Sequence, residues 1–339
     1  MEPKYETSSI YLTQLIDALG NNQSGTYLIP DFQRAYVWNP VQIINLLDTL
    51  FHGWPFGSIL LAQAPRAGSL FTARPLYQRI KADIEWSDGK YNLDIKEDTC
   101  VAQTNEPDAG YTLILDGQQR LQSLLFALSK TCQGIELTEY GWLCLYRKVS
   151  GYWSRFKDTY SPSARIYLNI SNLEYAMDRE NDIQSLNYIF GEQDGVKPIL
   201  EWCLDGETPN WNWRSGVPRN INEVKRDHIL LSDIWDFTGR YIDKYASADD
   251  IVFRTFSEDN VRNLCLQKEV DYKPVLFEFF KHVLSLHKLS IPYTKISLPM
   301  PEENACESDI NLYKRSVLNI YRKLTYGGNT LSENTTRDA

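Results

Sequence analysis

The sequence lacks the long apolar runs and leader signals that direct a chain into or across a membrane. No apolar stretch approaches the ~18 residues that a membrane-spanning helix needs, so no membrane span is expected. The first residues, MEPKYETSS, are polar and contain no apolar core of a signal peptide. A cytoplasmic protein without a membrane partner is therefore expected.

Disulfide and metal-binding patterns are also missing. The 6 cysteines are scattered, with no CxxC pair and no His at metal-binding spacing from them. A helix would place His282 and His287 on different faces, because their spacing does not match the helical repeat. The sequence therefore predicts reduced thiols, no metal site and no HNH-type nuclease centre in this chain.

The chain has a deficit of positive charge and no P-loop. Lys and Arg total 35 against 44 Asp and Glu, which gives a net charge of -9. This balance argues against a broadly basic nucleic-acid surface but leaves room for a local basic cleft. The absence of GxxxxGK[ST] excludes the P-loop type of phosphate site.

The clearest pattern that is present is a strand, a tight turn and a helix in residues 111–128. Residues 111–115 are a short apolar run typical of one buried strand. Beyond the turn, leucines recur at helical spacing and form an apolar stripe: Leu121, Leu124, Leu125 and Leu128. Asp116 stands where this helix would begin, with Gln119 three residues later, which is the spacing of a capping box.

Two interpretations of this turn are open from the residues alone. In one, Asp116 only caps the helix and Arg120 is solvated, as in many α/β proteins. In the other, Gly117 lets a ligand approach closely, while the N–H groups and dipole of the first helical turn attract an anion. Arg120 would then add a planar, permanently charged group that suits phosphate.

Three motifs resemble those of a known family. DGQQRL (116–121), placed after an apolar strand, resembles the signature of the GmrSD-type restriction endonuclease N-terminal domain family. IPDFQRAYVW (29–38) resembles the IPxFQRxYVW segment of that family almost letter for letter. IYRKLTYGGNTLS (320–332) is a weaker match, because Leu324 and Thr325 replace a pair that usually ends in Asn. The resemblance covers most of the chain in order.

The resemblance implies a fold related to the nucleotide-binding domains of ParB and to sulfiredoxin. It also implies that an NTP binds at the DGQQR turn, facing Gln33 and Arg34. The nucleotide and phosphate ligands would then be Gln33, Arg34, Gly117 and Arg120, with the two arginines neutralising phosphate charge.

Catalytic roles follow from the same resemblance, which leaves NTP hydrolysis open. Asp116 would hold Mg²⁺ or orient a water molecule. Gln118 or Gln119 would position that water, and Arg120 would stabilise the charge on the transferred phosphoryl group. The expected cofactors are therefore an NTP and the Mg²⁺ that accompanies it.

The biological setting implied is restriction of foreign or modified DNA in anti-phage defence. Nuclease activity is expected from another domain or a separate nuclease subunit, because fuller family members carry a nuclease domain beyond this region. The alternative is a non-catalytic DNA-binding or partner-docking subunit whose groove holds DNA phosphates. Tyr36 and Trp38 would then contact a base or sugar, and DNA binding would depend steeply on salt.

The whole chain is expected to adopt an α+β fold in two parts. The order of elements in residues 1–170 predicts an α+β domain with a mixed sheet, which carries both specific motifs. The resemblance implies that this domain is ParB-like. Residues 171–339 predict a mainly helical region packed on it. The first expected helix is capped by Ser8 or Ser9 and stops at Gly20. Further expected helices include residues 41–51, 183–190, 198–203, 273–289 and 307–324. The expected strands include residues 142–149, 165–170, 228–231 and 291–298, with a hairpin turn at 87–90.

Overall fold

The structure is a computed structural model of the whole chain. It describes residues 4–20, 27–30, 32–34, 36–38, 40–63, 73–76, 79–87, 90–96, 112–131, 134–137, 163–180, 198–205, 221–242, 255–297 and 306–325. The expected strand at 142–149, the expected helix at 183–190 and the Gly327–Gly328 turn lie outside these residues.

The first sheet is mixed, as the sequence predicted. In the described part of the chain it has 6 strands, in the order β1-β12-β3-β7-β2-β4. These strands are β1 (Lys4–Tyr11), β2 (Tyr27–Pro30), β3 (Ile59–Gln63), β4 (Ala73–Pro75), β7 (Thr112–Asp116) and β12 (Ser290–Ser297). The pairs β12–β3 and β2–β7 are parallel, and β1–β12, β3–β7 and β2–β4 are antiparallel.

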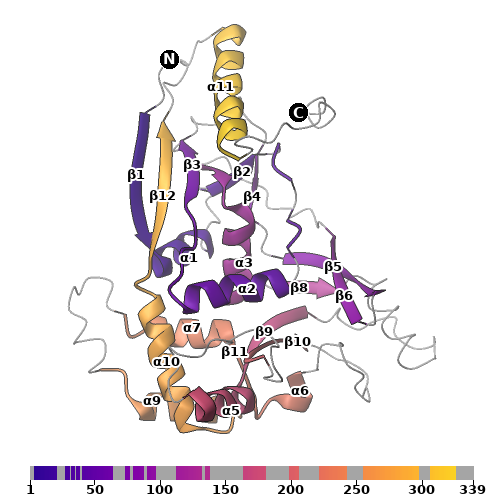
Figure 1. Ribbon diagram of the computed structural model, residues 1–339, viewed down its shortest axis with the longest axis vertical. Coiled ribbons are helices and arrows are strands. Elements are labelled where there is room, and N and C mark those ends of the chain that lie inside the picture. Colours follow the sequence, from indigo (N-terminus) through magenta and orange to yellow (C-terminus); the bar gives the residue numbers. More distant parts are fainter. Residues whose placement is uncertain are drawn as a thin grey trace.

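β12 comes from the second half of the chain yet lies between β1 and β3 (Figure 1). The division of the chain at residue 170 stays a prediction. β12, from the part after residue 170, belongs to the same sheet as strands from the part before it. β1 was not expected from the polar N-terminal sequence, and Ser8 and Ser9 lie in this strand rather than capping α1. An edge strand needs only backbone hydrogen bonds to one neighbour, so its residues carry no apolar alternation to find in the sequence.

The second sheet has the order β10-β9-β8-β5-β6 in the described residues, with β11 also paired to β9. Its strands are β5 (Arg79–Ser87), β6 (Lys90–Lys96), β8 (Gly134–Leu137), β9 (Ser163–Asn169), β10 (Leu200–Asp205) and β11 (His228–Leu230). Pairing of Ser87 with Lys90 confirms the expected hairpin. The helix expected at 198–203 was wrong, because this segment is β10 and pairs with β9.

The helices are α1 (Leu12–Gly20), α2 (Pro40–Phe51), α3 (Gln118–Leu128), α5 (Ile170–Glu180), α6 (Ile221–Val224), α7 (Leu231–Gly239), α9 (Glu258–Gln267), α10 (Pro274–Leu286) and α11 (Glu307–Thr325). The helices expected from sequence at the positions of α1, α2, α3, α10 and α11 are confirmed. Within the described residues, no helix is both long and apolar enough to cross a membrane.

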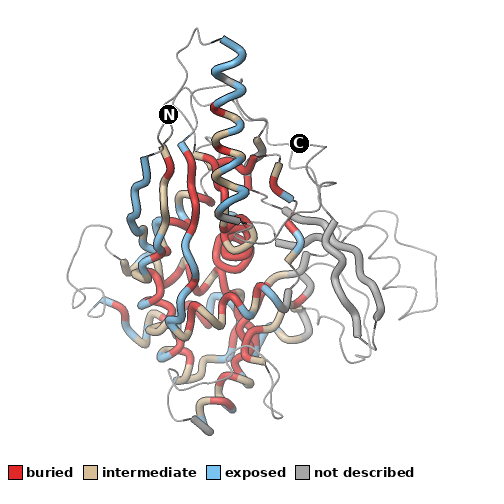
Figure 2. Tube along the Cα trace, turned by 45° about the horizontal axis from the view of Figure 1, so that its top comes forward, coloured by how far each residue is buried: buried red, intermediate tan, exposed pale blue. Residues whose placement is uncertain are grey.

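α3 is the central helix of the molecule. It contacts α1, α2 and α7, and the strands β8 and β9 of the second sheet. Every residue from Leu121 to Leu128 is buried, although the sequence predicted only one apolar stripe. The polar members Gln122 and Ser123 are also inside, so α3 is covered on all sides (Figure 2).

The central strands of the first sheet separate two hydrophobic clusters. Successive side chains of a strand point to opposite faces, so Ile59 and Leu61 of β3 join the larger cluster, which contains α3. Leu60 and Ala62 point the other way, into a smaller cluster that α11 covers with Tyr313 and Val317. This burial on both faces explains why β3 and β7 appear in the sequence as continuous apolar runs.

α11 should therefore contribute to stability through its buried face only. Tyr313 is 2% exposed and its hydroxyl donates to the Gln63 carbonyl at 3.0 Å, while the adjacent Leu312 is 53% exposed. Tyr313→Ala should lower the free energy of unfolding by about 3–5 kcal/mol, and Leu312→Ala by less than about 0.5 kcal/mol. Urea denaturation of both variants measures this, and equal costs would show that α11 does not cover the sheet.

Candidate nucleotide site

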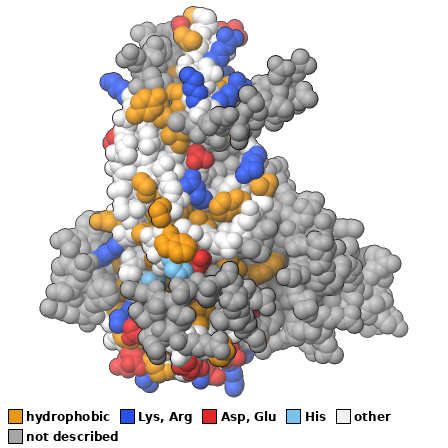
Figure 3. Space-filling model, viewed as in Figure 1, with side chains coloured by type: hydrophobic (Ala, Val, Ile, Leu, Met, Phe, Trp, Pro, Cys, Tyr) orange, Lys and Arg blue, Asp and Glu red, His pale blue; other side chains and the backbone are white. Residues whose placement is uncertain are grey.

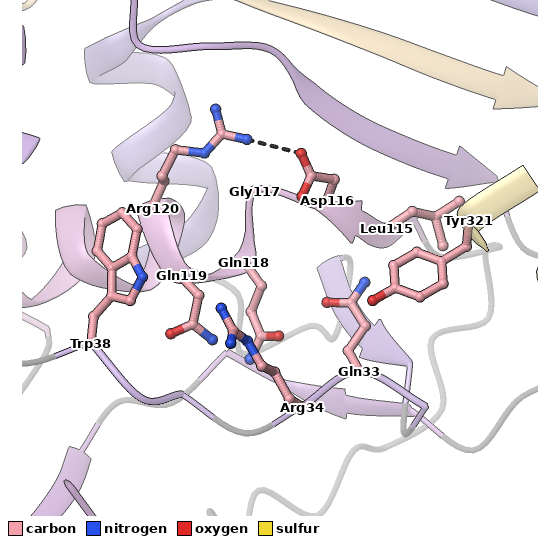
Figure 4. A pocket seen from close by; sticks show the side chains of 10 residues that line it. All are labelled: Gln33, Arg34, Trp38, Leu115, Asp116, Gly117, Gln118, Gln119, Arg120 and Tyr321. Carbon is pink, nitrogen blue, oxygen red and sulfur yellow. Dashed lines mark hydrogen bonds and ion pairs between the residues drawn. The ribbon is translucent and has the colours of Figure 1, made fainter. Parts of the chain in front are cut away.

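A pocket of about 390 Å³ lies where β7 ends and α3 begins. We call it the α3 pocket. It is lined by Gln33, Arg34, Trp38, Leu115, Asp116, Gly117, Gln118, Gln119, Arg120 and Tyr321 (Figure 4). The two specific sequence motifs thus meet in one place, as expected.

Sheet topology explains why these motifs meet. β2 and β7 are neighbouring parallel strands, with Tyr27 opposite Thr112 and Leu28 opposite Leu113. Because the carboxyl ends of parallel neighbours reach the same edge of a sheet, the loops that follow them emerge side by side. One loop carries Gln33 and Arg34, and the other is the DGQQR turn.

The turn itself differs from the predicted capping box. Gly117, not Asp116, is the N-cap of α3, with φ 95° and ψ 1°, a left-handed conformation that favours glycine. No side chain caps the helix. Asp116 is the last residue of β7, and the Gln119 Oε1 accepts a hydrogen bond from the Val37 N–H at 2.9 Å. The capping-box prediction was therefore wrong, because the turn is one residue later than expected.

The uncapped helix start gives the α3 pocket its electrostatic character. The first intrahelical bond runs from the Leu121 N–H to the Gly117 carbonyl at 2.9 Å. The N–H groups before Leu121 have no carbonyl one turn earlier in the helix, and they carry the positive end of its dipole. Since Gly117 to Arg120 line the pocket, this end of the helix is directed at whatever occupies it.

Gln118 is the most unusual residue of the site. Its side chain lines the pocket while the residue is only 5% exposed. The Nε2 atom is buried without a hydrogen-bond partner. An unsatisfied buried donor costs about 1–3 kcal/mol, which a fold tolerates when a ligand supplies the missing acceptor.

Arg120 is held by the protein itself. Its Nη1 donates to the Phe56 carbonyl at 2.9 Å, and its Nη2 to the Ser58 carbonyl at 2.9 Å. The same Nη2 makes an ion pair with the Asp116 Oδ2 at 3.0 Å, and the guanidinium lies 5.3 Å from the Phe56 ring centre. Arg120 therefore forms a wall of the pocket, and its substitution should disturb the fold as well as any ligand.

Comparison with known families identifies a match for the chain. A family model described as "GmrSD restriction endonuclease, N-terminal domain" matches residues 15–334. The chain belongs to this family. A search of curated proteins found no match. Since the GmrSD match spans both halves of the chain, it includes every residue that lines the α3 pocket.

The remaining predicted residues divide into core and pocket positions. Gln33 is 6% exposed, and its Nε2 donates to the Ile114 carbonyl at 2.5 Å, which ties its loop to β7. Tyr36 is 2% exposed and bonds to Ser123 at 2.8 Å. Tyr36 is therefore a core residue rather than a base-contacting one, whereas Trp38 lines the pocket.

Tyr321 of α11 is a pocket residue that sequence reasoning missed. It lines the α3 pocket, and its ring lies 5.1 Å from that of Phe32. The signal that could have found it is the third family-like run, whose second residue it is. In Figure 4 its ring stands next to Gln33, across the pocket from the start of α3.

A glycine pair can test how much the anchored Arg120 contributes to stability. Gly57 and Gly53 both have positive φ, 86° and 66°, so an alanine is strained at either. A Cβ at Gly57 would collide with the Arg120 Nη1, whereas a Cβ at Gly53 would meet nothing within 4 Å. Gly57→Ala should therefore cost about 1.5–3 kcal/mol more than Gly53→Ala, the range for hydrogen bonds to a charged group.

Chemical denaturation of the two glycine variants measures that difference. In an Arg120→Ala background the excess cost of Gly57→Ala should disappear, because the clashing group is gone. An excess that persists in this background would mean that the loop, not Arg120, carries the effect.

Proposed function

We propose that the chain is the nucleotide-binding component of a DNA restriction system that acts in anti-phage defence, and that an NTP binds in the α3 pocket. The observation that carries the proposal is the buried, unpaired amide of Gln118 at an uncapped helix N-terminus. Family membership supports the restriction setting. The nuclease activity would come from another domain or a separate subunit, acting on foreign or modified DNA.

The phosphates would lie against the start of α3. The first-turn N–H groups and the helix dipole favour an anion at this point, and Arg34, which is exposed, adds a positive charge from the opposite loop. Arg120 already neutralises one Asp116 oxygen, so it would act on phosphate from the wall of the pocket. The volume of about 390 Å³ falls within the usual range for small-ligand sites.

Mg²⁺ and the base would take the more open parts of the site. The Asp116 side chain is 48% exposed, so its second oxygen can reach an ion that bridges the phosphates. Trp38 offers an aromatic face for the base. For hydrolysis, Gln118 is a better candidate than Gln119 to orient a water, because the Gln119 Oε1 already accepts from the Val37 N–H.

DNA binding by the same groove is the alternative function. On the face drawn in Figure 3, Lys and Arg gather at the end where α11 projects, and elsewhere basic and acidic side chains are interspersed. The net charge of -9 also lacks the basic surplus of a duplex-binding surface. A nucleotide therefore fits the pocket better than a DNA backbone.

Gln118→Leu separates a binding role from a structural one. Leucine removes the buried Nε2 of Gln118, which has no hydrogen-bond partner, and with it the cost of desolvating that donor. Stability without ligand should therefore stay equal or rise. At an NTP concentration of 100 times Kd with Mg²⁺, the wild type should gain roughly 2.7 kcal/mol, and the variant should lose most of this gain. Thermal melts across the four common NTPs measure both quantities.

The arginine control is Arg34→Ala compared with Arg262→Ala. Arg262 is on α9, where it pairs with Glu258, and does not line the α3 pocket. Only the Arg34 variant should weaken NTP binding. If no NTP stabilises the wild type, or if Gln118→Leu keeps the full gain, NTP binding at this site is wrong. Salt-dependent stabilisation by duplex DNA alone would instead support the alternative.

A further inference from the structure

Three metal-ligating side chains meet on the second sheet, at residues that do not line the α3 pocket. They are Glu201 and Cys203 of β10 and His228 of β11, and their ligand atoms all lie within 4.8 Å of one another. Cys203 is fully buried, and the His228 side chain is 1% exposed. Such a grouping of thiol, imidazole and carboxylate has the chemistry of a zinc site.

Strand register explains how the three side chains come to the same face. Glu201 and Cys203 are two residues apart on a strand, so they point the same way. On β9, Tyr167 lies opposite Glu201 and Asn169 lies opposite His228. Residues opposite each other share a face of the sheet, and Tyr167 and Asn169 are also two apart. All three ligands therefore project from the same face of the second sheet.

The orientation of His228 is compatible with a role as a metal ligand. Its Nδ1 lies 3.2 Å from the Val224 carbonyl, which can only accept, so the proton is on Nδ1. In the neutral ring, the Nε2 lone pair then faces the Glu201 Oε2 at 3.4 Å. This distance is long for an N–H···O bond, which is usually ~2.7–3.2 Å. It equals the separation of roughly 3.4 Å between two tetrahedral ligands that each lie about 2.0–2.1 Å from zinc.

Glu201 is likewise held by outer partners. Its Oε1 accepts hydrogen bonds from the Asn169 Nδ2 at 2.7 Å and from the Asn172 Nδ2 at 3.1 Å. These two amides fix the carboxylate so that its other oxygen, Oε2, faces His228. Hydrogen bonds that orient ligating imidazoles and carboxylates are characteristic of metal sites.

We propose that Glu201, Cys203 and His228 bind a divalent transition-metal ion of the zinc class. One thiolate and one carboxylate balance its two positive charges, which is what a largely buried site requires. The Glu201 side chain is 18% exposed, so the fourth position of a tetrahedral ion is accessible to water or to another ligand. The ion would join β10 and β11, which both pair with β9.

The proposal predicts metal in the protein as it is purified. Untagged full-length chain, prepared without chelator, should contain about one zinc per chain by elemental mass spectrometry. The Cys203→Ser variant should lose at least about 10–100-fold in zinc affinity, the loss that even outer partners of a metal site cause. The control Cys306→Ser changes an exposed thiol next to Ser308 and should leave zinc content unchanged.

Cobalt substitution identifies the ligands independently of stability. Co²⁺ added to chelator-treated wild type should give a thiolate-to-cobalt charge-transfer band, and Cys203→Ser should abolish it. If Cys203→Ser does not fold, Glu201→Gln provides the second variant, because its amide oxygen can still accept from Asn169 and Asn172. That variant should keep the charge-transfer band but bind zinc more weakly in competition with a chromophoric chelator.

Two results would overturn the proposal of a metal site. One is a wild type that neither contains zinc nor competes with the chelator for it, since the three side chains would then be an ordinary buried polar cluster. The other is a folded Cys203→Ser that binds zinc as tightly as the wild type. Both readouts are independent of nucleotide binding, so they stand apart from the function proposed for the α3 pocket.

Discussion

One guanidinium anchors the start of α3 to the first sheet. Arg120 joins the end of β7 to the loop before β3, through Asp116 on one side and the Phe56 and Ser58 carbonyls on the other. Gly57 adopts a positive φ, and a side chain there would collide with the guanidinium. From this anchored start, α3 runs into the core, where it contacts α1, α2 and α7. The same guanidinium lines the pocket at the start of the helix.

The sequence predicted those helices and strands whose buried residues follow a regular pattern along the chain. The leucines of α3 and the apolar run of β7 were sufficient to predict a helix and a strand, because each set of residues is buried in a regular hydrophobic environment. Convergence of the two motifs was also predictable, but only through the family resemblance. The partners of Arg120 were not predictable, since backbone carbonyls more than sixty residues away leave no pattern in the sequence.

β10 shows where sequence reasoning fails. Its residues LEWCLD admit both a helix and a strand when read alone, and the choice is made by pairing with β9. No metal site was expected, because the cysteines are scattered and no His stands at metal-binding spacing from them. On a helix, Glu201 and Cys203 would also point in different directions. Only the strand places them on one face, next to a histidine from β11. Because a helix was predicted at 198–203, neither the strand β10 nor the grouping of its side chains with His228 was expected.

The place of β12 has a consequence for synthesis of the protein. β3 emerges early from the ribosome, but its parallel neighbour β12 follows roughly 230 residues later. At about 5–20 residues per second, one edge of β3 waits about 10–45 s for its partner. Hairpins form within about 1–10 μs, so local pairs are complete long before the sheet can close. During this interval the unpaired backbone groups of β3, flanked by apolar side chains, can pair with other nascent chains. Early protection by a chaperone would therefore favour correct assembly.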